Sequence, residues 1–188
     1  EFRRHVAGVL DFFGPALRMR RASFLADANA LVIPMPRLLA LLETLHSEFR
    51  IQNAECGMQR ERGLPLFAFI DAFHVERKST ADWQELAARG LRRVYIGMES
   101  GHDPLLRWLN KPGDAAAVLD AATTLKAAGL QASVIILLGA GGQPYADGHV
   151  RDTAALLNAM PLGKGDLVYF SDFVVHADAP YAALAAAG

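Results

Sequence analysis

The sequence contains very little cysteine and no long apolar run. Cys56 is the only cysteine among the 188 residues, so the chain cannot form an internal disulfide, as is usual in a reducing compartment. No apolar stretch approaches the roughly 20 residues that span a bilayer, and the first residues do not resemble a signal peptide. These absences lead us to expect a cytoplasmic protein without a membrane partner.

An excess of charge of either sign is also absent. The formal net charge is −1, which gives no electrostatic reason to expect a nucleic acid or an anionic membrane as partner. The six histidines do not show the spacing of a metal site, so no metal is predicted. A chain of this length suits a single domain with a sizeable core, and we expect one domain over residues 1–188.

What the sequence does contain is an alternation of helix and strand patterns. Apolar runs predict strands at 21–25, 66–70, 93–98, 132–138 and 167–175. A helical pattern precedes each of them or lies between them, at 6–17, 36–49, 79–90, 115–128 and 150–159. Because the strands are continuously apolar, as in sheets covered on both faces, the sequence predicts a parallel α/β fold. Periodicity alone does not decide between a barrel and an open sheet.

Polar residues follow most of the predicted strands. In a parallel sheet all carboxyl ends of the strands lie at one edge, where such folds bind their ligands. The candidates are Asp27, Asn29, Asp71, His74, Glu99, Ser100, the loop 139–142 and Asp172. They predict a concave polar site for a ligand with amino, hydroxyl and carboxylate groups. The alternative, that each carboxylate caps a helix or pairs with an arginine, stays open.

Glu99 and Ser100 are the strongest of these candidates, because an apolar run leads directly into them. Gly101 follows and would let a ligand approach the backbone closely. Two other residues look ordinary: the sequence predicts a solvated Lys111 in a turn, and a His149 that caps a helix or faces solvent.

The glycines at 139–142 do not form a dinucleotide-binding fingerprint. Pro144 occupies the place of the third glycine, and the next helical pattern begins only at residue 150. A glycine-lined turn that lets a cofactor lie across the edge of the sheet fits better.

Taken together, these motifs resemble the radical SAM superfamily over most of the chain. The segments that carry the resemblance are 24–31, 88–93, 95–101, 109–111 and 134–142. The resemblance implies a partial (β/α)6 TIM-like barrel, in which the strands predicted here would be numbers two to six. We therefore expect a truncated core domain that lacks the first βα unit.

The resemblance also implies a cofactor site for S-adenosylmethionine. In this family the stretch after strand two holds the methionine amino group, which here would be Asp27 to Asn29. The residues after strand four contact the ribose and the methionyl part, which would be Glu99 and Ser100. Strand five supports adenine and ribose, here between Val134 and Gly139.

One departure from the family is severe. Its Cys-x-x-x-Cys-x-x-Cys motif, whose three thiolates hold a [4Fe–4S] cluster, is absent. In the complete family enzyme that cluster cleaves S-adenosylmethionine reductively, and the resulting radical abstracts hydrogen from substrate. We expect that the cluster loop preceded Glu1, that Cys56 is a bystander and that this chain alone is inactive.

Two other functions remain open on the sequence. One is a non-catalytic barrel that lost its cysteines and serves as a binding or scaffold module. The other is a TIM-type hydrolase or lyase that uses Glu99 and Asp71 as an acid/base pair. The sequence does not indicate a substrate. Because the strand at 22–25 would have an unpaired edge, we also expect self-association.

Overall fold

The computed structural model describes residues 1–26, 29–55 and 64–175. Its five strands form one sheet in the order β1-β2-β3-β4-β5, and every neighbouring pair is parallel. The strands are β1 (Ser23–Leu25), β2 (Leu66–Asp71), β3 (Leu91–Glu99), β4 (Gln131–Leu138) and β5 (Leu167–Asp172). The predicted parallel α/β fold is therefore confirmed, although β1 begins two residues later and β5 ends three residues earlier than the sequence patterns indicated.

Helices connect the strands. They are α1 (Phe2–Phe13), the 3-10 helices η1 (Gly14–Met19) and η2 (Ala30–Val32), α2 (Met35–Glu55), α3 (Ala72–Val75), α4 (Thr80–Ala88), α5 (Asp103–Trp108), α6 (Ala115–Ala127) and α7 (Gln143–Ala159). A capping box formed by Ser79 and Asp82 starts α4, within the helical pattern predicted at 79–90. The short helix α3 was not predicted and no bounds were predicted for α5, because four and six residues are too few to show a helical period.

The prediction that the helix after β4 begins at residue 150 was wrong. α7 begins at Gln143, directly after the N-cap residue Gly142. Pro144 does not prevent this, because the first turn of a helix has no use for its missing N–H group. The loop 139–142 is consequently a tight connection from β4 into α7, and Gly139, Gly141 and Gly142 all have positive φ angles.

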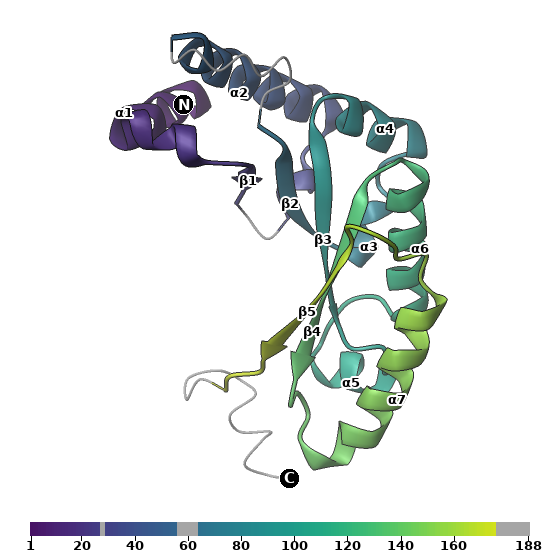
Figure 1. The fold of residues 1–188 in the computed structure, drawn as a ribbon. Coiled ribbons are helices and arrows are strands. Elements are labelled where there is room, and N and C mark those ends of the chain that lie inside the picture. The colour runs from purple at the N-terminus through teal and green to yellow at the C-terminus, as the bar shows by residue number, and fades with distance from the viewer. Residues whose placement is uncertain (27–28, 56–63, 176–188) are drawn as a thin grey trace.

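The helices and the sheet form layers (Figure 1). Helices α3, α4 and α6 pack against β2, β3 and β4, and α7 packs against α6. The core lies between these helices and the sheet, where burial alternates along the strands: Ile70, Val94 and Ile96 are buried, whereas their sequence neighbours on the other face are only partly buried.

The opposite face of the sheet carries a row of aromatic side chains. Phe69 lies 4.8 Å from Phe24 and 5.4 Å from Tyr95, measured between ring centroids, and Tyr95 lies 5.7 Å from Tyr169. Phe24 is 41% exposed and Tyr169 is 44% exposed. The expectation that both faces are covered was therefore wrong for the described part of the chain, because its helices pack mainly on one face.

The register of the sheet brings the carboxyl ends of the strands to one edge. Asp71 of β2 pairs with Gly97 of β3, and the pairing of β3 with β4 shifts between Gly97 and Glu99. Such a β-bulge bends the strand locally and re-aims the side chains around it. The predicted convergence of polar residues at one edge is thus a property of the fold.

Candidate functional site

A cluster of three charged residues lies at this edge, where β2 and β3 end. Lys111 donates hydrogen bonds through Nζ to Asp71 Oδ1 at 2.7 Å and to Glu99 Oε1 at 3.0 Å. All three side chains are largely buried, at 18–24% exposure. We call Asp71, Glu99 and Lys111 the edge cluster. The prediction that Lys111 is solvated was wrong: after α5 the backbone N–H of Lys111 bonds to Leu106 O, and this turn returns the side chain to the sheet.

The charges of the edge cluster stabilise one another. Burial disfavours the ammonium of Lys111, but its hydrogen bond to Asp71 and the nearby charge of Glu99 outweigh this cost and raise the pKa of Lys111. Burial likewise opposes ionisation of Asp71, but hydrogen bonds from Lys111 and Asn29 lower the pKa of that carboxyl. Asp71 and Lys111 are therefore both charged at neutral pH.

Gly97 provides the space that the edge cluster occupies. A Cβ atom at this position would lie 2.8 Å from Glu99 Oε1 and 3.1 Å from Lys111 Nζ. The absence of a side chain near the carboxyl end of β3 thus lets the carboxylate and the ammonium lie directly over the strand. No role was predicted for this glycine, because its importance depends on side chains that come from other elements.

Asn29 and His74 support Asp71 from neighbouring elements. Asn29 donates through Nδ2 to Asp71 Oδ2 at 2.7 Å and accepts the backbone N–H of Asp71 at 2.8 Å. His74 Nδ1 lies 3.2 Å from Asn29 Oδ1, so this nitrogen carries the proton of that hydrogen bond. Both residues were correctly predicted to lie at the shared edge. Asp27, which was also predicted to lie there, is outside the described residues.

Glu99 has an uncommon backbone conformation. Its φ angle is +61°, in the left-handed region that non-glycine residues rarely adopt. The backbone N–H of Ser100 bonds to Met98 O at 2.7 Å and closes a tight turn around Glu99. Strained backbone of this kind is enriched at functional sites.

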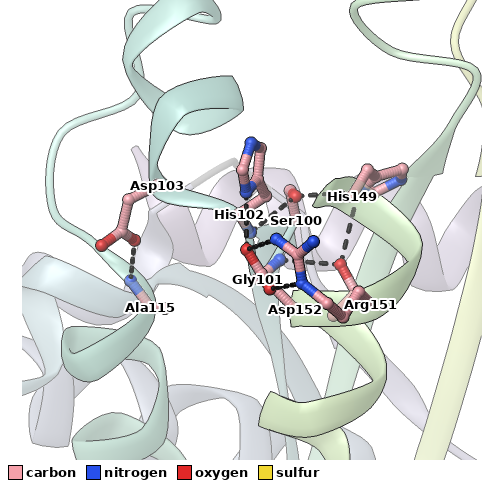
Figure 2. Close-up of polar contacts among 9 residues, drawn as sticks. Ser100, Gly101, His102, Asp103, Ala115, His149, Arg151 and Asp152 are labelled. Atoms are coloured by element: carbon pink, nitrogen blue, oxygen red, sulfur yellow. Dashed lines mark hydrogen bonds and ion pairs between the residues drawn. The ribbon is translucent and has the colours of Figure 1, made fainter. Parts of the chain in front are cut away.

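The side chain of Ser100 points toward His149 of α7 (Figure 2). It is fully buried, its Oγ lies 2.8 Å from His149 Nδ1, and the same oxygen accepts the backbone N–H of His102 at 2.9 Å. His149 is itself buried, at 7% exposure, so the prediction that it caps a helix or faces solvent was wrong. The interaction joins residues 49 positions apart and has no local sequence signal.

Gly101 serves a different purpose from the one predicted. A Cβ atom there would lie 2.6 Å from the backbone oxygen of Asp152, so α7 and not a ligand takes up the space beside this glycine. The N–H of Gly101 donates to Thr153 Oγ1 at 2.9 Å, which fixes the contact with α7.

The two remaining predicted site residues belong to β4 and its end. Val134 is fully buried in the core beneath the helices. Gly139 has a φ of +80° and no neighbouring atom within 4 Å of a Cβ built on it, so space is open beside its backbone. Within the described residues no group of three or more His, Cys, Asp or Glu side chains is arranged to hold a metal ion. Among the described helices, none has both the length and the apolarity needed to cross a membrane.

The parallel sheet, with helices on one face, defines a section of an α/β barrel, and its charged cluster lies at the edge where such folds bind their ligands. No protein-family model and no curated protein matches the sequence. Solved structures do match the fold, and those compared below are radical SAM enzymes.

Three of them illustrate the similarity. Coproporphyrinogen III oxidase (HemN) from Escherichia coli, a radical SAM enzyme, has a TM-score of 0.55 at 13% identity over 89% of this chain and 38% of its own. TsrM from Kitasatospora setae, a radical S-adenosylmethionine methyltransferase, has a TM-score of 0.56 at 19% identity over 89% of this chain and 30% of its own. HydG, a maturase of the [FeFe]-hydrogenase, has a TM-score of 0.56 at 16% identity over 96% of this chain and 38% of its own.

The chain thus has the partial-barrel fold of radical SAM enzymes, and the resemblance predicted from the sequence is confirmed at the level of the fold. It spans 30–38% of the length of these three enzymes. Identities this low show a shared fold and do not carry an activity from one protein to another.

Proposed function

We propose that this chain forms part of a radical SAM enzyme and contributes the edge cluster to its S-adenosylmethionine site. The observation that carries this proposal is the lysine held between two carboxylates, Asp71 and Glu99, at the carboxyl edge of a radical SAM-like sheet. Ligands of parallel α/β sheets bind at this edge.

The charge of the edge cluster suits this ligand. One ammonium set against two carboxylates leaves one negative charge. S-adenosylmethionine carries an ammonium, a sulfonium and a carboxylate, so its net charge is positive and complements the cluster. A cation at a largely buried site gains more from such pairing than it would in water.

Two residues of the edge cluster, Glu99 and Lys111, each offer the ligand a distinct group. Glu99 uses Oε1 for Lys111, so Oε2 is the acceptor available for a ligand ammonium or hydroxyl among the described contacts. Lys111 uses two of its three N–H donors on carboxylates, which leaves the third for the carboxylate of the ligand. Asn29 binds both the side chain and the backbone of Asp71 and holds that carboxylate in place.

The other predicted contacts would contribute less to binding S-adenosylmethionine. The adenine and ribose end would lie along residues 134–139, where the open space beside Gly139 allows a close approach. The side chain of Val134 belongs to the core, so it would support that end only indirectly. The hydroxyl of Ser100 is already bound to His149 and would act through its neighbour Glu99. The contact of Asp27 with the methionine amino group stays a prediction, since Asp27 is outside the described residues.

The residues present do not fit an iron–sulfur cluster. Such a cluster takes three thiolates in this family, and the 188 residues contain Cys56 alone. In a complete enzyme the cluster ligands would have to come from residues beyond these 188, and the substrate would be set by that larger protein.

Isothermal titration calorimetry of this chain tests the proposal. S-adenosylmethionine should bind, and S-adenosylhomocysteine, which lacks the sulfonium charge, should bind more weakly. Glu99→Gln should weaken binding by about tenfold, the factor that corresponds to loss of one charge-assisted hydrogen bond. The matched control is Glu85→Gln, which removes a carboxylate paired with Arg89 on α4 and should leave binding unchanged.

The proposal fails if the unmodified chain does not bind S-adenosylmethionine, or if Glu99→Gln binds it with unchanged affinity. It also fails if a substrate is turned over without iron or S-adenosylmethionine, which would favour the hydrolase or lyase alternative. The lowered pKa of Asp71 suits a base better than an acid in that alternative. Binding to a partner protein without any affinity for S-adenosylmethionine would favour the scaffold alternative.

A further inference from the structure

We infer that His149 is a positioning residue for Glu99, and that it acts through the hydroxyl of Ser100. This inference deepens the proposed function and rests on it for its consequence in ligand binding. Glu99 needs such support because a left-handed backbone costs a non-glycine residue about 1–2 kcal/mol, and its φ is +61°. Contacts just beyond Glu99 must hold the chain in this conformation.

The hydrogen bonds around His149 have a defined direction. His149 Nε2 lies 3.1 Å from Leu137 O, and a carbonyl oxygen only accepts, so Nε2 carries the proton. In the neutral ring Nδ1 is then an acceptor, and the Ser100 hydroxyl at 2.8 Å donates to it. Ser100 Oγ in turn accepts the N–H of His102 at 2.9 Å. Neither the hydroxyl nor the imidazole is left without a partner.

These bonds connect the ends of two strands with one helix. Leu137 lies near the end of β4, Ser100 follows the end of β3, and His149 lies on α7. Figure 2 shows the contact between Ser100 and His149. A change in the Ser100 backbone would move Glu99 directly, because the two residues are neighbours, and the bonds of the Ser100 hydroxyl to His149 and to the N–H of His102 hold that backbone in place. His149 therefore couples the position of α7 and β4 to the direction of the Glu99 carboxylate.

Other contacts between α7 and this loop are separate from that of His149. Thr153 accepts the N–H of Gly101, and Asp152 Oδ2 lies 2.6 Å from His102 Nδ1. Thr153 Oγ1 also lies 3.3 Å from His149 Nδ1, a longer contact than that of Ser100. These contacts attach α7 to the loop even when the ring of His149 is replaced, so the histidine can be tested without removing the helix.

Two amide variants test the hydrogen bonds of the two ring nitrogens of His149 one at a time. In His149→Asn the amide oxygen occupies about the place of Nδ1 and still accepts from Ser100. In His149→Gln the amide nitrogen occupies about the place of Nε2 and still donates to Leu137 O, while Ser100 loses its acceptor. Ser100→Ala removes the same hydrogen bond from the other side. Val150→Gln is the control on α7, because Val150 is 69% exposed.

Two measurements on these variants test the inference. The first needs no ligand: the NMR coupling between the amide and α protons of Glu99, together with the intraresidue nuclear Overhauser effect, reports its φ angle. The second is the affinity for S-adenosylmethionine. We expect His149→Gln and Ser100→Ala to lose the single left-handed conformation of Glu99 and to bind about fivefold or more weakly. His149→Asn and Val150→Gln should keep both properties within about twofold.

The inference fails if Glu99 keeps its φ angle in both His149→Gln and Ser100→Ala. It also fails if His149→Asn loses the conformation as completely as His149→Gln, since packing of the ring and not its acceptor would then matter. If His149→Gln does not fold, the comparison of Ser100→Ala with His149→Asn decides the question. If the unmodified chain does not bind S-adenosylmethionine, the proposed function fails, and the NMR measurement still tests the role of His149.

Discussion

Lys111 Nζ lies 2.7 Å from Asp71 Oδ1, although 40 residues separate the two positions in the sequence. The contact exists because the turn after α5 returns the chain to the edge of the sheet where β2 ends. Three predictions concern this edge and the helix that contacts it, and a fourth concerns the first strand.

Replacing Lys111 should destabilise the protein in a pH-dependent way. Lys111→Met leaves Asp71 and Glu99 without their shared cation, and we expect a loss of about 1–2 kcal/mol at pH 7 because the side chains are only partly exposed. Folding lowers the pKa of Asp71, so its contribution is complete above the ordinary value of 3.8 and is lost as the pH falls through the lowered value. Urea unfolding at pH 7 and at pH 3 measures the free energy of unfolding of the unmodified chain and of Lys111→Met.

The difference in stability between the two proteins should therefore shrink at pH 3. Lys164→Met is the control, since Lys164 is exposed. An equal difference at both pH values would show that Lys111 stabilises the fold by packing and not by its charge.

A side chain at Gly97 should displace the edge cluster. The Cβ atom of Gly97→Ala would overlap Glu99 Oε1 at 2.8 Å, and we expect a loss of about 1–3 kcal/mol together with weaker binding of S-adenosylmethionine. Gly163→Ala is the matched control, because no atom lies within 4 Å of its added Cβ and its φ is not positive. Thermal unfolding and calorimetry measure the two effects, and equal behaviour of both variants would contradict the assignment of Gly97.

The stability of the protein should fall when the pH drops below 6.5, in part through His149. Burial lowers the pKa of His149, so between this lowered value and the ordinary 6.5 the unfolded chain binds a proton that the folded chain does not. The stabilisation by the neutral ring is complete above pH 6.5 and is lost as the pH falls through the lowered pKa.

The stability difference between the unmodified chain and His149→Gln isolates this effect, because both proteins share the other five histidines. His102 is the neighbour whose charge opposes protonation of His149, and Asp152 pairs with His102 and Arg151. Chemical denaturation from pH 7.5 to pH 5 should show the difference decreasing. A constant difference over that range would mean that folding does not lower the pKa of His149.

The edge of β1 should promote association between copies of this chain. Among the described strands β1 pairs with β2 alone, and unpaired strand edges add strands from other chains. Phe24→Lys would place a charge on this edge strand and should shift the chain toward monomer in analytical ultracentrifugation. The control is Phe12→Lys, which changes another exposed phenylalanine, on α1, and should leave the association unchanged. A monomer over a wide concentration range in the unmodified chain would contradict the expectation.

The sequence predicted the framework well because strand and helix patterns are local. The apolar run before Glu99 and the glycines at 90 and 129, which have positive φ angles where α4 and α6 end, each depend on a few neighbouring residues. The parallel arrangement followed from their alternation, and with it the convergence of Asn29, Asp71 and Glu99 at one edge.

The sequence alone thus determined the order of the elements, the parallel sheet and the edge at which polar residues gather, since periodicity and chain connectivity suffice for these. Only the tertiary structure decided which residues meet there. Lys111 and His149 looked like ordinary surface residues, yet they hold Asp71, Glu99 and Ser100 through contacts across 12 to 49 positions. The reason is physical: hydrogen bonds and ion pairs depend on distances of about 3 Å in the folded chain, and residue type and spacing along the sequence do not specify those distances.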